Sequence, residues 1–213
     1  MMNRKKYILE TELNFPCVIC GLCCQHVDRS EIYEDLDRGD GTCRHYDDKT
    51  RHCKEYNNRP VRCNIDKYYD IYVDGKISRA EFYSINVEAC RNLWKEAVMA
   101  DKWINIGPLK TADISPYNHC IGLYRHLVDG KVMYIGRAIE YNNGGFRKRL
   151  SDYRRDSDSA RKHTSGRIIH AHLDKIVTEI LIVGDGAEAI EETKRLEKEY
   201  IKQFSPEWNK QEK

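Results

Sequence analysis

The stretch 122–136 reads GLYRHLVDGKVMYIG and decides the fold of the C-terminal half of the chain. Two runs rich in apolar and aromatic residues flank Asp129-Gly130, a dipeptide typical of a two-residue hairpin turn. Each run has a tyrosine two residues from a glycine, and a glycine inside a strand often marks the close approach of another backbone or a ligand. We therefore expect a β-hairpin with the hydroxyls of Tyr124 and Tyr134 on one face. The alternative is plain strand propensity, since the chain has 14 tyrosines.

The sequence beyond the hairpin carries one more strand pattern and several helix patterns. β-branched residues predict a third strand over 178–184, and helices are expected over 146–155, 165–176 and 185–204. Ser205-Pro206 ends the last helix. This pattern predicts an α/β fold with a small mixed three-stranded sheet and flanking helices.

The chain is expected to contain two domains joined by a linker. A cysteine-rich, mostly helical domain is expected over 1–103, and the α/β domain over 119–213. The segment 104–118 contains two prolines and a glycine, a composition typical of linkers. No stretch approaches the ~20 apolar residues that a membrane helix needs, and the first residues lack the apolar core of a signal peptide. We therefore expect a cytoplasmic protein with no membrane partner.

The helix expected over 185–204 aims one carboxylate inward. At about 100° per residue, the apolar residues Ile190, Tyr200, Ile201 and Phe204 share a face, and Glu197 lies in the middle of it. A carboxylate in that position is costly unless a cation or a metal ion accompanies it. Two possibilities stay open: an internal salt bridge to an arginine, or a metal site.

Positive charge concentrates in 147–167, which holds eight basic and three acidic residues. Such a cluster is usually a solvated helix face. It is also the kind of charge that a phosphate backbone attracts.

Five separated motifs of the C-terminal segment occur in an order that matches a known nuclease family. They are GLY, YIG ten residues later, the arginine of FRKRL, the glutamate of LEKEY and the asparagine of PEWN. Together they resemble the GIY-YIG nuclease domain over about 120–210. The resemblance is greatest to the N-terminal nuclease domain of the bacterial excision-repair incision subunit, whose helices are similar to RKRLSDY and EKEYIKQFSPEWN. It implies a metal-dependent endonuclease that hydrolyses phosphodiester bonds.

The resemblance implies roles for three charged or phenolic groups at the reacting atoms. Glu197 would hold a single Mg²⁺ or Mn²⁺, ions that prefer hard oxygen ligands. Tyr134, or Tyr124 beside it, would take or relay the proton of the attacking water. Arg149 would stabilise charge on the phosphoryl oxygens.

The resemblance assigns three further residues to the site. Arg137 follows YIG, where the repair relatives carry a basic residue, and Tyr153 matches their helix tyrosine. Asn209 would brace the site by hydrogen bonds. The sequence departs from the family at Leu123, which replaces an isoleucine, and at 141–145 (YNNGG), which lengthens the step to the arginine.

Seven of the nine cysteines lie between positions 17 and 63. A chain without an export signal is a poor candidate for a disulfide framework, so the clustering favours metal ligation. The pattern CxxCGxCC…C…CxxYxxRPxxC resembles the zinc- or iron-chelating CxxCxxCC domain. Its cysteines are Cys17, Cys20, Cys23, Cys24, Cys43, Cys53 and Cys63. Zinc usually takes four ligands, so the choice between zinc and an iron–sulfur cluster stays open, with a slight preference for the cluster.

The expected function is a metal-dependent DNA endonuclease whose cysteine-rich domain supports folding, substrate choice or regulation. RNA is not excluded as the substrate, because the expected site reads phosphates and not bases. No recognisable DNA-reading domain accompanies the motifs, so specificity is expected from the cysteine-rich part or from a protein partner. Restriction, anti-phage defence, mobile-element cutting and repair are the roles considered. The alternatives are a non-catalytic nucleic-acid-binding or assembly module, and a redox or metal sensor.

Overall fold

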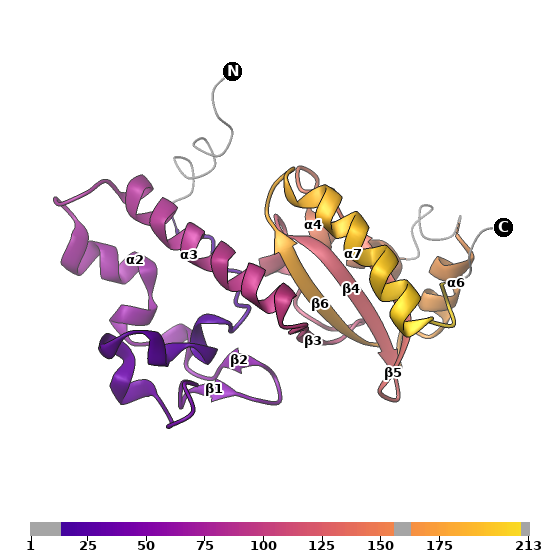
Figure 1. Cartoon of the computed structure of the whole chain (residues 1–213), viewed down its shortest axis with the longest axis horizontal. Coiled ribbons are helices and arrows are strands. Elements are labelled where there is room, and N and C mark those ends of the chain that lie inside the picture. The colour runs from indigo at the N-terminus through magenta and orange to yellow at the C-terminus, as the bar shows by residue number, and fades with distance from the viewer. Residues whose placement is uncertain (1–13, 156–162, 210–213) are drawn as a thin grey trace, which may run out of the picture. The chain divides into compact units, whose positions relative to one another are not determined.

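A computed structural model describes residues 14–155 and 163–209, and the chain divides into two compact units between Leu93 and Trp94 (Figure 1). Helix α3 (Arg79–Met99) runs across this division in the sequence. Within the described ranges, no helix is long and apolar enough to cross a membrane.

The N-terminal unit consists of short elements. Two strands, β1 (Tyr46–Asp47) and β2 (His52–Cys53), pair antiparallel. A short helix, α2 (Ile65–Tyr68), continues into a π-helical turn, Tyr69–Val73. The remaining elements before α3 are the 3₁₀ helices Cys23–Gln25, Val27–Arg29, Glu31–Leu36, Tyr56–Asn58 and Val61–Cys63. Buried Val27, Leu36, Cys43 and Tyr46 form a small core. The unit expected to be mostly helical contains mainly short 3₁₀ helices before α3.

The C-terminal unit contains a four-stranded antiparallel sheet in the order β3-β6-β4-β5. The strands are β3 (Ile104–Pro108), β4 (Ile121–Val128), β5 (Lys131–Ala138) and β6 (Val177–Gly184). The helices are the 3₁₀ turn Ser115–Tyr117, α4 (Gly145–Arg154), α6 (Thr164–Ala171) and α7 (Ala189–Phe204).

The hairpin expected from 122–136 is present as β4 and β5. Asp129 and Gly130 connect the strands with φ values of 50° and 79°. Two successive positive φ values give a turn whose twist matches that of the strands, and aspartate followed by glycine tolerates them. The helices expected after the hairpin are also present, and α7 ends before Ser205, whose φ is 44°.

The expectation of a mixed sheet with three strands is wrong, because the sheet has four strands and every pair is antiparallel. The fourth strand, β3, comes from the segment expected to be a linker. Ile104 and Ile106 are buried, and Asn105 between them is not. A bulge between Asn105 and Gly107 interrupts the pairing with β6. Buried and less buried side chains therefore alternate over only three residues of β3. Gly107 and Pro108, which are unfavourable inside strands, follow directly, so the sequence does not indicate a strand here.

The two faces of the sheet have different coverings. On one face, Leu196 and Tyr200 of α7 pack against Leu123, Ile135 and Leu181 of the strands; Figure 1 shows α7 lying along this face. Side chains alternate along a strand, so the residues next to Leu123 and Ile135 point to the opposite face.

Candidate functional site

Three tyrosines gather on the face of the sheet opposite α7. Tyr124 pairs with Gly136 and His126 pairs with Tyr134, which places both hairpin phenols on the same face. The ring centroids of Tyr124 and Tyr134 are 6.1 Å apart. Tyr153 of α4 completes the cluster, with its hydroxyl 2.8 Å from that of Tyr124. The structure thus brings the two hairpin tyrosines and the helix tyrosine together.

Gly136 makes this cluster possible. A Cβ atom at position 136 would lie 2.5 Å from the hydroxyl oxygen of Tyr124 and 2.7 Å from Cε1 of Tyr134. Real side chains do not approach so closely, so both rings occupy space that only a glycine leaves open. Gly122 has a different reason, since a Cβ there would lie 2.1 Å from the carbonyl oxygen of Leu181 on β6. Gly136 thus leaves room for the Tyr124 ring, and Gly122 leaves room for the backbone of β6.

The three phenols hold their protons at neutral pH. Burial raises the pKa of Tyr124 and of Tyr153 well above the ordinary value of a phenol. Burial also raises the pKa of Tyr134, but side-chain hydrogen bonds with Tyr153 and Tyr124 oppose the rise. Tyr134 is therefore the phenol of the cluster for which two hydrogen bonds oppose the effect of burial on the pKa.

His126 lies inside the tyrosine cluster and was missed by sequence reasoning. It is fully buried, and its ring centroid is 5.2 Å from that of Tyr124 and 5.9 Å from that of Tyr134. Its Nδ1 is 3.1 Å from the Oγ1 of Thr178, and its Nε2 has no partner among the described residues. Burial lowers the pKa of His126 to about 3, so the ring is neutral. Strand alternation was the available signal, because positions 124 and 126 share a face.

Arg149 projects its charge into the same region. Its guanidinium pairs with Glu140, a partner that no sequence motif indicated. The positive charge of Arg149 opposes the burial-driven rise of the pKa of Tyr124, Tyr134 and Tyr153. Its Nε is buried and has no hydrogen-bond acceptor among the described residues. Arg149 thus keeps a donor unused beside the phenols.

The segment 141–145, which departs from the family pattern, forms the turn that starts α4. The amides of Asn143 and Gly145 donate to the carbonyl of Glu140 at 2.8 and 3.1 Å. A Cβ at Gly145 would lie 2.2 Å from the carbonyl oxygen of Cys120. The turn is therefore packed tightly against the start of β4, which fixes the first turn of the helix that carries Arg149.

Glu197 lies on the α7 side of the sheet and pairs with Arg137 of β5. Its side chain is 14% exposed, in agreement with an inward orientation. Burial raises the pKa of Glu197, and the charges of Arg137 and Arg149 oppose this effect. Of the two possibilities left open by the sequence, the structure contains the salt bridge. The Arg137 side chain is 41% exposed, so it can move into solvent and leave the carboxylate of Glu197. A single carboxylate fits a hard divalent cation that keeps several of its waters.

Asn209 holds the outer edge of β5. Its side-chain amide donates to the carbonyl of Ile135 at 2.7 Å, and its carbonyl accepts from the amide of Ile135 at 2.8 Å. The amide of Trp208 donates to the carbonyl of Met133 at 2.9 Å. Because β5 is an edge strand of the sheet, these bonds satisfy backbone groups that would otherwise have no strand partner.

The two groups of residues approach each other around β5. Tyr134 and Gly136 face the tyrosine cluster, and Ile135 and Arg137 face α7. A register shift between His126 and Leu127 places Val132 on the α7 side as well. Burial is the main cause of the raised pKa of Tyr134, and the negative charge of Glu197 raises this pKa further. Arg149, on the tyrosine side, lowers the pKa of Glu197. Strand pairing, hydrogen bonds and ion pairs place Tyr124, Tyr153, Glu197 and Asn209 beside Tyr134, Ile135 and Arg137 of this edge strand. Arg149 is electrostatically coupled to the phenols and to Glu197.

The cysteines of the N-terminal unit share one neighbourhood. A hydrogen bond with Cys23 and burial raise the pKa of Cys24, and the charges of Cys23, Cys53 and Cys43 raise it further. A hydrogen bond with Cys24 lowers the pKa of Cys23 to about 7, against the effect of burial. Within 14–155 and 163–209, however, no three His, Cys, Asp or Glu side chains converge as a metal site. The thiols are near enough to interact but are not arranged as a complete ligand set.

The basic cluster of 147–167 has largely structural contacts. Arg154 donates to the carbonyls of Leu109 and Ala112, both at 2.5 Å. Lys148 and Arg155 pair with Asp152 at 3.3 and 3.4 Å. Arg147 donates to the side-chain oxygen of Asn118 at 3.0 Å. The cluster members Arg161 and Lys162 lie outside the described residues. Arg147 and Arg154 therefore tie α4 to residues outside the helix, whereas the pairs of Lys148 and Arg155 with Asp152 are local to it.

No protein-family model, curated protein or solved structure matches the chain.

Proposed function

We propose that the C-terminal unit is a metal-dependent endonuclease that hydrolyses phosphodiester bonds in DNA, as its resemblance to GIY-YIG nucleases implies. The observation that carries the proposal is the meeting of a phenol cluster, Arg149 and Glu197 around strand β5. A phosphoryl-transfer site needs a proton acceptor, a cation for the phosphoryl oxygens and a place for a divalent ion. These residues supply all three.

Burial raises the pKa of Tyr134, so Tyr134 would accept the proton of the attacking water only after releasing its own to solvent, which the charge of a divalent ion at Glu197 would favour. Its hydrogen bonds with Tyr153 and Tyr124 lower its pKa against the larger effect of burial, so the negative charge that develops on its oxygen has two partners. Tyr124 and Tyr153 would then position Tyr134 and would not exchange protons with the water themselves. Arg149 would donate to the phosphoryl oxygens, where its planar set of donors matches the geometry.

Glu197 is the residue that would hold Mg²⁺ or Mn²⁺. A divalent ion at this carboxylate would supply charge neutralisation and make the attacking water easier to deprotonate. The Arg137 guanidinium would leave Glu197 when such an ion binds, because two cations compete for one carboxylate. The released Arg137 would be available to a phosphate.

The cysteine-rich unit is proposed to bind zinc or an iron–sulfur cluster through the thiols between Cys17 and Cys63. Its effect on the nuclease would be to support folding, substrate choice or regulation. The gathering of several thiols in one neighbourhood supports this assignment.

One observation favours a second candidate function, a nucleic-acid-binding module without turnover. The ion pair between Arg137 and Glu197 satisfies the carboxylate without any metal, and a permanent pair would prevent cation binding. Arg149 and the basic residues of α7 would still attract phosphates.

Nicking of supercoiled plasmid by the full chain, purified without oxygen, tests the proposed reaction. The assay contains Mg²⁺, Mn²⁺ or EDTA, and a labelled RNA of the same sequence replaces the DNA in a parallel reaction. Metal-dependent conversion of plasmid to open circles is expected, with loss in EDTA. Binding of plasmid without nicking in either metal would favour the binding module.

A further inference from the structure

We propose that a hollow beside α7 binds the phosphates that flank the scissile bond, with Lys194 and Lys198 as its principal contacts. The proposal rests on the proposed endonuclease function and adds two residues to its substrate-binding surface. Lys194 lies outside the motifs that suggested that function, and Lys198 lies within LEKEY but has no role assigned by the resemblance.

The hollow has a volume of about 560 Å³ and opens to solvent. It is lined by one residue of β5 and five of α7: Arg137, Glu191, Lys194, Arg195, Lys198 and Glu199. Charged side chains thus form its whole lining, which suits an ionic ligand.

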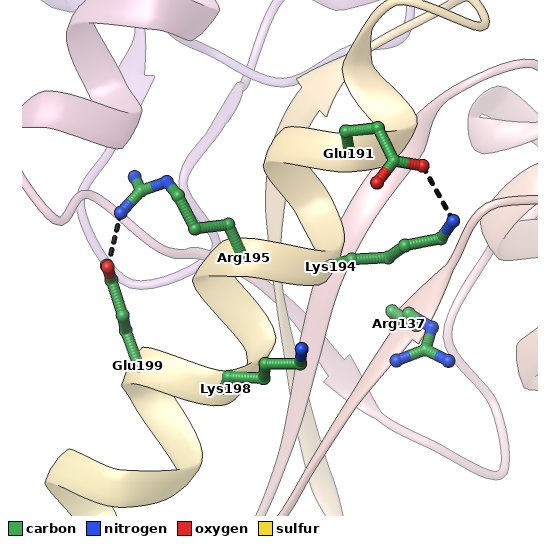
Figure 2. Close-up of a pocket in the computed structure, with 6 residues that line it drawn as sticks. All are labelled: Arg137, Glu191, Lys194, Arg195, Lys198 and Glu199. Carbon is green, nitrogen blue, oxygen red and sulfur yellow. Dashed lines mark hydrogen bonds and ion pairs between the residues drawn. The ribbon is translucent and has the colours of Figure 1, made fainter.

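The direction of the side chains gives the hollow a positive side. Figure 2 shows Lys194 and Lys198 leaving α7 toward the side on which Arg137 lies, while Arg195 and Glu199 leave the helix on its other side. Lys194 and Lys198 are four residues apart, so they project from the same helix face. Arg137 is 41% exposed and the Lys194 side chain 40%.

The charges on this side do not cancel. Arg195 is neutralised by Glu192 and Glu199, so it contributes little to the field of the hollow. On the Arg137 side, three cations (Arg137, Lys194, Lys198) face two carboxylates (Glu191, Glu197), which leaves a net charge of +1. Lys198 forms no ion pair with any described residue.

The hollow adjoins the proposed reaction centre. Arg137 both lines it and pairs with Glu197. The charge of Lys198 also lowers the pKa of Glu197, against the larger effect of burial. A strand whose scissile phosphate lies at Glu197 and Arg149 would therefore place neighbouring phosphates within reach of both lysines. Phosphate contacts of this kind fix position without reading sequence.

Equilibrium binding of a fluorescein-labelled 20-base-pair duplex in EDTA tests the proposal, because binding is then measured without cleavage. The doubly substituted protein Lys194→Gln/Lys198→Gln is compared with Lys110→Gln/Lys131→Gln. The control lysines have exposed side chains with one carboxylate partner each, Asp174 and Glu207, and do not line the hollow. Both variants lose the same charge.

The hollow variant should bind roughly ten-fold or more weakly than wild type, and the control within about two-fold. The slope of log affinity against log salt should fall by roughly 1 for each lost phosphate contact in the hollow variant only. Equal losses in the two variants, unchanged affinity in the hollow variant, or no binding of DNA by the wild type would each overturn the proposal.

The same variants separate this proposal from the proposed reaction. If only the hollow variant loses DNA binding and the wild type does not nick plasmid, phosphate binding in the hollow is supported and the endonuclease function is rejected. Normal nicking and normal binding by the hollow variant would keep the endonuclease and reject the hollow.

Discussion

Gly136 and His126 are the two residues on which the geometry of the phenol cluster depends. Gly136 leaves the space that the Tyr124 ring occupies, and His126 fills the fully buried position between the rings of Tyr124, Tyr134 and Tyr153. Neither residue donates a proton or carries a charge at neutral pH. Both act through the tyrosines beside them.

Substitution of Gly136 by alanine should displace Tyr124. The new Cβ would overlap the Tyr124 hydroxyl, and overpacking of this kind costs about 1–3 kcal/mol. Urea denaturation should show the loss in the free energy of unfolding, and nicking should fall with it. The control is Gly186→Ala, since nothing lies within 4 Å of a Cβ there. Equal stability of the two variants would contradict the crowding at Gly136.

His126 should make the protein sensitive to acid. Its pKa is about 3 in the folded protein, against about 6.5 when unfolded. Below about pH 6.5 the unfolded chain therefore binds a proton that the folded chain does not, and the free energy of unfolding falls as the pH falls toward 3. The loss should reach several kcal/mol, at about 1.4 kcal/mol for each unit of the difference.

Urea denaturation between pH 7 and pH 4 measures this dependence. The variant His126→Phe has no titrating ring, so its stability should fall less steeply than that of the wild type. His172→Gln, at an exposed position, should keep the wild-type slope. Parallel pH curves for the wild type and His126→Phe would exclude the assignment of a neutral buried ring.

Strand β5 is the element around which the candidate site is built. It is an edge strand, and its outer backbone groups bond to Trp208 and Asn209 from the segment that follows α7. Its two faces carry Tyr134 and Arg137 to opposite sides of the sheet. The hydrogen bonds of Trp208 and Asn209 to this edge strand therefore position both Tyr134 on one face and Arg137 on the other.

Asn209→Ala should loosen β5 and impair nicking. The substitution removes two hydrogen bonds and leaves the backbone amide and carbonyl of Ile135 without partners, at a cost of about 1–3 kcal/mol. Thermal unfolding measures the effect, and Asn143→Ala, whose side chain is exposed, should stay within about 0.5 kcal/mol of wild type. Wild-type stability and activity in Asn209→Ala would show that the C-terminal segment does not support the strand.

Much of the C-terminal unit could be predicted from local patterns, and the remainder depends on contacts between distant residues. The hairpin, β6 and α7 follow from turn chemistry and periodicity over eight or more residues. β3 has only Ile104 and Ile106 as a signal before its bulge. The partners Glu140 of Arg149 and Arg137 of Glu197 are set by how elements pack, which no local pattern contains.

The whole molecule joins a unit with a small core to a unit with a sheet. Seven of its nine cysteines lie in the first 63 residues, whereas all three tryptophans, Trp94, Trp103 and Trp208, lie in the C-terminal unit. Small cores such as that of Val27, Leu36 and Tyr46 often need metal to be stable. Tryptophan fluorescence therefore reports on the sheet unit, and far-ultraviolet circular dichroism on both.

Removal of thiol-bound metal should destabilise only the N-terminal unit. Elemental analysis of the protein purified without oxygen should find zinc or iron. After treatment with a strong chelator, heating should produce an early transition in circular dichroism, while the transition in tryptophan fluorescence stays in place. Absence of both metals from the purified chain, or a joint shift of the two transitions, would contradict the division of roles between the units.

Glu197 is proposed to be the metal-holding carboxylate of a phosphodiester-cleaving centre. The most direct measurement is the rate of plasmid nicking in Mn²⁺ by the wild type, Glu197→Gln and Glu192→Gln. Glu192 lies on the same helix and also pairs with an arginine, Arg195, but faces solvent. We predict a loss of about 10²-fold or more for Glu197→Gln, the scale of removing a principal electrostatic contact, and little change for Glu192→Gln. Nicking by Glu197→Gln at the wild-type rate would show that Glu197 does not hold the metal ion.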